Sequence, residues 1–292
     1  MLNSLNLKLA VLVAGFAASA GAAPREILLI AGPPSHTRLA HEQNAAAMLF
    51  ARFLNQVPGI HATVSKSGWP SDESLVAKAD AIWMFCDGGE KHLIAQDDHT
   101  AEMQAAAHRG AGMMFYHYGV EPPDKSLHQE FLDWIGGYFE LRYSVNPIWD
   151  ADFASLPKHP ITRGVTPFKL KDEWYYNIRF RPGMQGITQI LVSTPPASSL
   201  SRPDGPHEGN PDVRAKVGQP QCMMWAYERP DGGRGVGFTG GHFHLNLGDD
   251  NFRKLVLNAL VWVAKGEVPA NGVASHVTQE ELMQNLDVGK KP

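Results

Sequence analysis

The chain has 292 residues, of which 43% are hydrophobic and 19% charged, and its formal net charge is -4. This composition is typical of a globular protein with a large buried core. The 26 Lys and Arg residues are outnumbered by 30 Asp and Glu, and no run is rich in Lys or Arg, which argues against nucleic acid as a partner. The unusual feature is the presence of 13 histidines in a chain with only two cysteines.

The first 22 residues are typical of a secretory signal peptide. Residues 9–18 form an apolar run that is preceded by Lys8 and followed by small residues. This run is about half the roughly 20 residues that a membrane span needs, and cleavage after Ala20 or Ala22 fits the small-residue rule. No later stretch is long and apolar enough for a span. We therefore expect an exported protein, periplasmic or secreted, with a buried N-terminal helix as the alternative.

Short apolar runs alternate with helical patterns along the chain. The runs predict strands at 26–31, 61–65, 81–86, 112–116 and 234–239, and the helical patterns predict helices at 42–56, 97–108 and 250–265. A continuous apolar run is typical of a strand that is buried on both faces, as in a parallel sheet. The alternation predicts the α/β fold class, with a doubly wound, mostly parallel, flavodoxin-like sheet.

The middle of the chain is less regular. Residues from about 122 to 230 contain a strand candidate at 187–192 and a loop rich in Pro and Gly at 195–220. Because the final strand and helix resume the opening pattern, we expect one α/β domain over 24–268 with a long irregular insertion. Residues 269–292 are expected to be a loosely attached C-terminal extension.

Polar side chains follow four of the predicted strands where each one ends. They are Ser35, His36, His41 and Glu42 after the first strand, Asp87 and Glu90 after the third, His117, Tyr118 and Glu121 after the fourth, and His242 and His244 after the last. Ligands of doubly wound sheets bind beyond the carboxyl ends of the strands, where these side chains are expected to meet. The same residues are alternatively surface or hydrogen-bonded loop histidines.

The expected site has the composition of a metal centre. His242 and His244 are two residues apart, which in extended backbone puts both rings on the same side. Imidazoles with carboxylates suit Zn, Mn, Fe or Ni. The predicted ligands are His36, His41, His117, His242 and His244.

Other chemistries are less well supported by the sequence. There is no G-x-S-x-G elbow and no Walker loop, and the Gly-rich segment 233–237 lies in a late strand, which makes a dinucleotide site unlikely. The aromatic residues Trp149, Trp174 and Tyr175 are candidates for stacking on a sugar, with an aromatic mini-core as the alternative. Cys86 and Cys222 are either a disulfide or free thiols.

Several segments together resemble the ThuA-like (trehalose utilisation) family. They are, in chain order, IAGPPSHTRLAHE (30–42), ADAIWMFCDGG (79–89), GAGMMFYHYGVE (110–121), HPITRGV and DEWYY within 159–176, and GGRGVGFTGGHFHLN and FRKLVLNALVW within 232–262. The resemblance implies a class I glutamine amidotransferase-like fold and a link to carbohydrates, in particular oxidised (keto) sugars and disaccharides. Amidotransferases of this fold carry a nucleophilic Cys on the turn where this sequence has His117, so the usual glutamine hydrolysis is not expected.

Three functions follow as hypotheses. The first is a metal-assisted enzyme acting on a keto-sugar or glycoside by isomerisation, elimination or hydrolysis, with Glu173 or Glu121 as the base and Asp87 among the residues that contact substrate. The second is a non-catalytic periplasmic sugar-binding module. The third is a partner subunit of a sugar dehydrogenase. A homo-oligomer is compatible with each of them.

Overall fold

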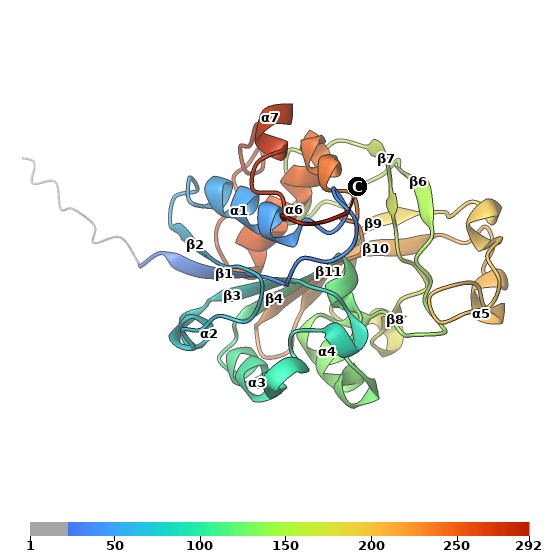
Figure 1. Cartoon of the computed structure of the whole chain (residues 1–292), viewed down its shortest axis with the longest axis horizontal. Coiled ribbons are helices and arrows are strands. Elements are labelled where there is room, and N and C mark those ends of the chain that lie inside the picture. Colours follow the sequence, from blue (N-terminus) through green and yellow to red (C-terminus); the bar gives the residue numbers. More distant parts are fainter. Residues whose placement is uncertain (1–22, 292) are drawn as a thin grey trace, which may run out of the picture.

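A mostly parallel sheet forms the centre of the molecule in the computed structural model, which describes residues 23–291 (Figure 1). The sheet has seven strands in the order β2-β1-β3-β4-β11-β10-β9. Their bounds are Arg25–Ala31 (β1), Ile60–Ser65 (β2), Ala81–Phe85 (β3), Gly112–Tyr116 (β4), Ile187–Ser193 (β9), Gln221–Glu228 (β10) and Arg234–Phe238 (β11). The first five strands in that order pair in parallel, and β10 and β9 are antiparallel. The predicted doubly wound α/β fold is confirmed.

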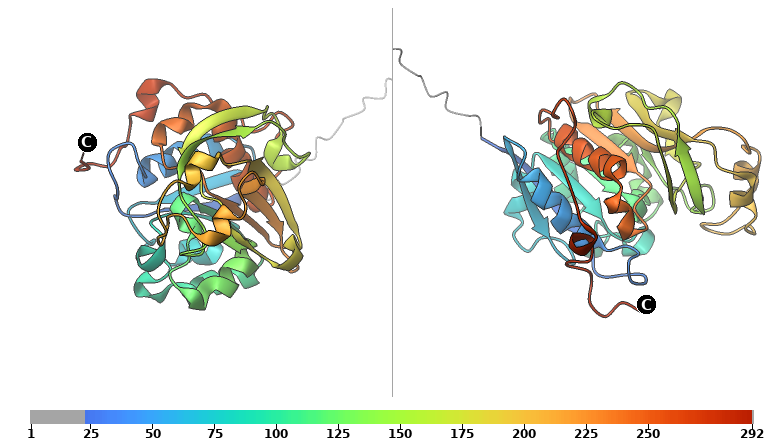
Figure 2. Two further views of the ribbon diagram at one scale, coloured as in Figure 1. Left: turned by 90° about the vertical axis from the view of Figure 1, so that its right-hand side faces the viewer. Right: turned by 90° about the horizontal axis from the view of Figure 1, so that it is seen from above.

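Helices cover both faces of this sheet, as Figures 1 and 2 show. One face packs against α1 (Gln43–Leu54) and α6 (Asp250–Val263), and the other against α2 (Ser74–Lys78), α3 (Thr100–His108) and α4 (His128–Trp134). Strands covered on both sides must be apolar throughout, and every residue of β3 and β4 is buried. Each predicted helix is present, with bounds shifted by a few residues.

The segment predicted as an irregular insertion contributes regular structure. Strands β9 and β10 extend the central sheet, and β6 (Ile148–Phe153) pairs with β7 (Phe168–Glu173) in an antiparallel ribbon. The remaining elements of this part are β5 (Gly137–Tyr138), β8 (Arg179–Phe180) and α5 (Pro211–Arg214). Alternate residues of β6 are buried, which is why its aromatic side chains point into the protein.

The C-terminal segment is attached more firmly than the sequence indicated. It contains α7 (Gln279–Leu282), whose start is a capping box between Thr278 and Glu281. Val273 and Leu282 are buried in the main core, and the chain then runs back beside the loop after β1 (Figure 2). The expectation of a loose extension is wrong because these apolar side chains anchor it.

Two further expectations concern the compartment. The predicted signal peptide, residues 1–22, lies outside the described residues. Within residues 23–291, no helix combines the length and the hydrophobicity that crossing a membrane requires.

Cys86 and Cys222 are both free and buried, so they do not form a disulfide.

His92 provides a test of the packing behind the sheet. Its side chain is fully buried, and its Nε2 donates to the Gly119 carbonyl at 3.1 Å. Burial lowers the pKa of His92 from 6.5 to about 4. As the pH falls, His92 is therefore protonated in the unfolded chain at a higher pH than in the fold. The neutral His92 stabilises the fold above pH 6.5, and this stabilisation is lost by pH 4.

We expect the free energy of unfolding of the metal-free protein to fall as the pH drops from 6.5 to 4, with His92 accounting for about 3 kcal/mol. Urea unfolding at several pH values measures this dependence. His92→Gln should have a shallower dependence than the wild type, and identical slopes for the two proteins would contradict the assignment.

Candidate functional site

The parallel register brings the ends of four strands to one edge of the sheet. Ala31 pairs with Phe85 across β1 and β3, and Phe238 pairs with Tyr116 across β11 and β4. The loops that follow these strands therefore begin side by side, as the sequence predicted.

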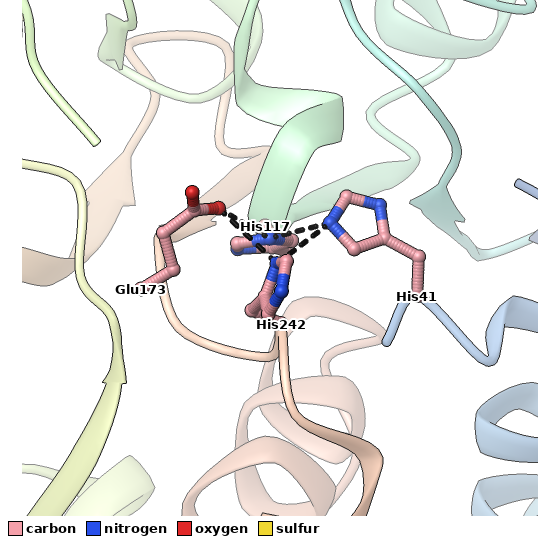
Figure 3. A group of neighbouring side chains, drawn as sticks. All are labelled: His41, His117, Glu173 and His242. Carbon is pink, nitrogen blue, oxygen red and sulfur yellow. Dashed lines mark hydrogen bonds and ion pairs between the residues drawn. The ribbon is translucent and has the colours of Figure 1, made fainter. Parts of the chain in front are cut away.

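Three imidazole nitrogens and one carboxylate oxygen converge at this edge (Figure 3). They belong to His41, His117, Glu173 and His242, which we call the His–Glu cluster. His41 Nε2 lies 3.0 Å from His117 Nε2 and 3.1 Å from His242 Nδ1. Glu173 Oε2 lies 3.2 Å from His242 Nδ1 and 3.5 Å from His117 Nε2. All four donor atoms lie within 4.8 Å of one another.

These separations match those of the ligands around a metal ion. A tetrahedral zinc ion with bonds of about 2.0–2.1 Å separates its ligand atoms by roughly 3.3 Å. The donor set of three imidazoles and one carboxylate also suits Mn, Fe and Ni. The His–Glu cluster therefore has the spacing and the chemistry of a metal site.

The backbone fixes the orientation of His117. This residue directly follows β4 with φ 51°, a left-handed conformation that is costly for a residue other than glycine and is common at functional sites. Its Nδ1–H donates to the Thr239 carbonyl at 2.8 Å. The lone pair of Nε2 therefore faces the centre of the cluster, as in a metal-binding histidine.

His41 lies deepest in the group. It is 1% exposed, and burial together with the neighbouring histidine rings lowers its pKa well below the ordinary value. Its Nε2 faces the cluster, while its Nδ1 lies 3.5 Å from Asp87 Oδ1 and has no hydrogen-bond partner among residues 23–291. His41 is therefore a neutral imidazole with a carboxylate behind it.

Glu173 enters the cluster from the end of β7. Burial alone would raise the pKa of Glu173, but its contacts with His117 and His242 outweigh burial and hold the pKa well below the ordinary value. An ionised carboxylate is a good metal ligand and a weak proton acceptor. The sequence led us to expect that burial raises the pKa of Glu173, and the shift has the opposite direction.

Asp172, the preceding residue, holds the loop that carries His242. Its buried carboxylate accepts hydrogen bonds from the Gly241 amide at 2.8 Å, the His242 amide at 3.0 Å and the Asn246 side chain at 3.0 Å. Gly241 has φ 116°, and a Cβ there would lie 2.2 Å from the Tyr116 ring, so only glycine fits. Adjacent residues of β7 thus orient and complete the cluster.

Two predicted ligands lie outside the His–Glu cluster. The short 3-10 helix η8 (His244–Gly248) begins at the second histidine of the H-x-H pair, so the extended spacing assumed for the pair does not hold. His244 Nε2 donates to the Leu282 carbonyl at 2.9 Å instead. His36 stacks on His41 with ring centroids 3.6 Å apart, and its Nδ1 lies 3.7 Å from Asp87. His36, His41 and Asp87 therefore form a second group of possible metal ligands beside the His–Glu cluster.

The aromatic residues proposed for sugar stacking are buried inside the protein. Trp149 is 4% exposed and Trp174 is fully buried, and each indole N–H donates to a backbone carbonyl. Neither ring offers a face to a ligand, so the mini-core alternative describes them. Tyr175 is also buried, with its hydroxyl 3.2 Å from His117 Nε2.

A cavity of about 730 Å³ opens beside the cluster. His36, Asp87 and Tyr118 line it on the side of the cluster, and Glu121 and His207 line it further out. Glu121 Oε2 lies 2.8 Å from His207 Nε2. Glu121, one of the two predicted bases, therefore faces space that a small molecule can occupy and is outside the His–Glu cluster.

Sequence reasoning missed three contributors to this site. Thr239 acts through its carbonyl, which no residue pattern reveals, and His207 comes from the loop before α5, far from any predicted strand end. For Asp172 the sequence favours a salt bridge at a strand edge over a role as acid/base or ligand, although its position beside Glu173 in DEWYY is a usable signal.

The comparisons with known proteins agree with this architecture. The family model described as ThuA, trehalose utilisation, matches residues 34–263. A putative ThuA-like protein from Bacteroides uniformis is 16% identical, with a TM-score of 0.54 over 85% of this chain and 95% of that one. Another, from Parabacteroides merdae, is 15% identical, with a TM-score of 0.52 over 88% and 94%. PurLQS from Thermotoga maritima is 12% identical, with a TM-score of 0.44 over 82% and 99%.

The chain belongs to the ThuA family, because the family model covers most of its length. The two ThuA-like structures confirm the predicted fold, and family membership links the protein to trehalose utilisation and carbohydrate handling. No curated protein matches the chain.

The role of Asp172 gives a prediction about stability. Asp172→Ala removes an acceptor from the Gly241 and His242 amides and from the Asn246 side chain, and we expect the free energy of unfolding to fall by about 3 kcal/mol. Asp172→Asn, which keeps an acceptor oxygen, should lose less. Urea unfolding measures both changes. Asp150→Ala, on the exposed face of β6, is the control and should change stability by less than about 0.5 kcal/mol; an equal effect of Asp172→Ala and Asp150→Ala would refute the role.

Proposed function

We propose that the His–Glu cluster binds one divalent metal ion, Zn, Mn, Fe or Ni, and that the protein is a metal-assisted enzyme acting on a carbohydrate. The observation that carries this proposal is the convergence of His41, His117, His242 and Glu173 at separations of 3.0–3.5 Å between neighbouring donor atoms. Membership of the ThuA family supports the choice of a carbohydrate substrate.

The positions of the protons on the histidine rings support the proposal that the His–Glu cluster binds a cation. The His117 proton lies on Nδ1, because this nitrogen faces a carbonyl at 2.8 Å. If the single proton of neutral His41 is on Nδ1, two lone pairs oppose each other over the 3.0 Å between His41 and His117. If it is on Nε2, the Nδ1 lone pair faces the Asp87 carboxylate.

A metal ion at the centre removes this conflict. His41 would then bind through Nε2 and direct its Nδ1–H toward Asp87, which is the usual arrangement of a carboxylate behind a metal-binding histidine. This assigns Asp87 an orienting role in addition to its place in the cavity wall.

The cavity supplies the other groups that the reaction needs. A bound divalent ion polarises a sugar carbonyl or hydroxyl and makes the neighbouring C–H or O–H more acidic. Glu121 would accept or return the proton, with His207 holding its carboxylate in place. Burial raises the pKa of Tyr118, so its hydroxyl stays protonated and can donate to a sugar oxygen.

We also propose export from the cytoplasm through residues 1–22.

Metal content is the first test. The purified protein, loaded with Zn, Mn, Fe or Ni and dialysed, should retain close to one equivalent by mass spectrometry. His242→Ala should lose at least 100-fold in affinity, because it removes a ligand from the cluster. His244→Gln is the matched control and should keep its metal, since His244 lies outside the group. Failure of the wild type to retain any of the four metals would overturn the proposal.

Turnover is the second test. The metal-loaded protein should convert members of a panel of keto-glycosides and keto-disaccharides, followed by liquid chromatography and mass spectrometry. Glu121→Gln should lower kcat about 100-fold or more and leave metal content unchanged. Glu90→Gln, on the exposed rim of the same cavity, should retain activity. Saturable sugar binding without turnover would replace the enzyme by the non-catalytic binding module.

A further inference from the structure

Lys290 is a buried lysine beside the His–Glu cluster, in a segment that has no helix or strand. Its side chain is only 3% exposed. Its Nζ donates to the carbonyls of Ala40 and His41 at 2.8 and 2.9 Å. Glu42 Oε1 at 3.5 Å and Asp287 Oδ2 at 3.4 Å balance its charge. A buried ammonium group is costly unless it is paired in this way, so this contact is a specific one.

The backbone that Lys290 binds is strained. Leu39 has φ 67° and His41 has φ 47°, although neither is glycine. Such conformations persist only where the surroundings fix them. Two carbonyls of this turn are held by the Lys290 ammonium group, and the Leu39 amide donates to Glu42 at 2.8 Å.

Other residues of the C-terminal segment form further hydrogen bonds with the loop after β1 and the start of α1. The Arg38 amide donates to the Lys291 carbonyl at 2.8 Å, and the Asp287 amide donates to Glu42 Oε2 at 2.8 Å. Asn44, in the first turn of α1, donates to Asp287 Oδ1 at 2.7 Å. These bonds join residues about 245 positions apart in the sequence.

The segment also forms a wall of the site. A second cavity, of about 540 Å³, is lined by His36 and His242 on one side and by residues 288–291 on the other. The C-terminal segment and the loop after β1 lie side by side in both views (Figures 1 and 2).

We propose that residues 287–291 are a strap that completes the site, and that Lys290 is a positioning residue that aims His41 at the metal. The part of this proposal that concerns metal rests on the proposed function, whereas the ordering of the loop does not. A strap that served only to anchor the chain end would stabilise the protein without a selective effect on His41.

The test compares Lys290→Met with Lys291→Met, a neighbouring control whose side chain is exposed. In the metal-free proteins, hydrogen–deuterium exchange of residues 38–44 should be at least 10-fold faster in Lys290→Met than in Lys291→Met or the wild type. In the same proteins, zinc affinity measured against a competing chelator should fall about 10- to 100-fold in Lys290→Met alone. Lys290→Arg, which keeps the charge and the donors, should recover part of both losses.

Each outcome decides one part of the proposal. Unchanged exchange and unchanged zinc affinity in Lys290→Met would overturn the strap. Faster exchange with unchanged affinity would overturn the positioning role. If the wild type binds no zinc, the proposed metal centre fails, while the exchange experiment still decides whether Lys290 orders the loop. Should Lys290→Met not fold, the double variant Asp287→Asn/Lys290→Met removes the buried pair together and gives the same comparison.

Discussion

The parallel register of β1, β3, β4 and β11 is the constraint on which the site depends. Parallel strands end at the same edge, so the loop after each strand begins within reach of its neighbours. Three of the four cluster residues come from such loops, and the fourth comes from the end of β7. Residues far apart in sequence thus meet because the apolar strands between them are paired and buried.

The burial of so many polar groups requires partners outside the cluster. His117 is oriented by the Thr239 carbonyl, the His242 loop by Asp172, and the His41 loop by Lys290. Each partner satisfies a polar atom that would otherwise be costly to remove from water. The site is therefore a set of nitrogen and oxygen atoms whose positions are fixed by a surrounding shell of hydrogen bonds, which is the arrangement that the proposed metal binding requires.

The sequence was informative where local pattern determines structure. Apolar runs identified the strands, and the parallel fold then placed His41, His117 and His242 at one edge. The prediction from sequence failed for His244 because a short helix interrupts the extended backbone. It failed for Trp149 and Trp174 because the sequence does not distinguish an aromatic residue in a core from one on a binding surface. Asp172 and Lys290 act through contacts with residues far away in the sequence, and such contacts leave no periodic pattern.

His117 occupies the turn at which the resemblance to amidotransferases would place a nucleophile. The turn after β4 has the left-handed backbone of a nucleophile elbow, but it presents an imidazole. Burial raises the pKa of Cys86 to about 12 and also raises that of Cys222, so neither sulfur is an accessible thiolate. An imidazole on this turn, facing two more histidines and a carboxylate, is poorly arranged to attack an amide and well arranged to hold a cation. The strained turn thus presents an imidazole, and not a thiol, to the centre of the cluster.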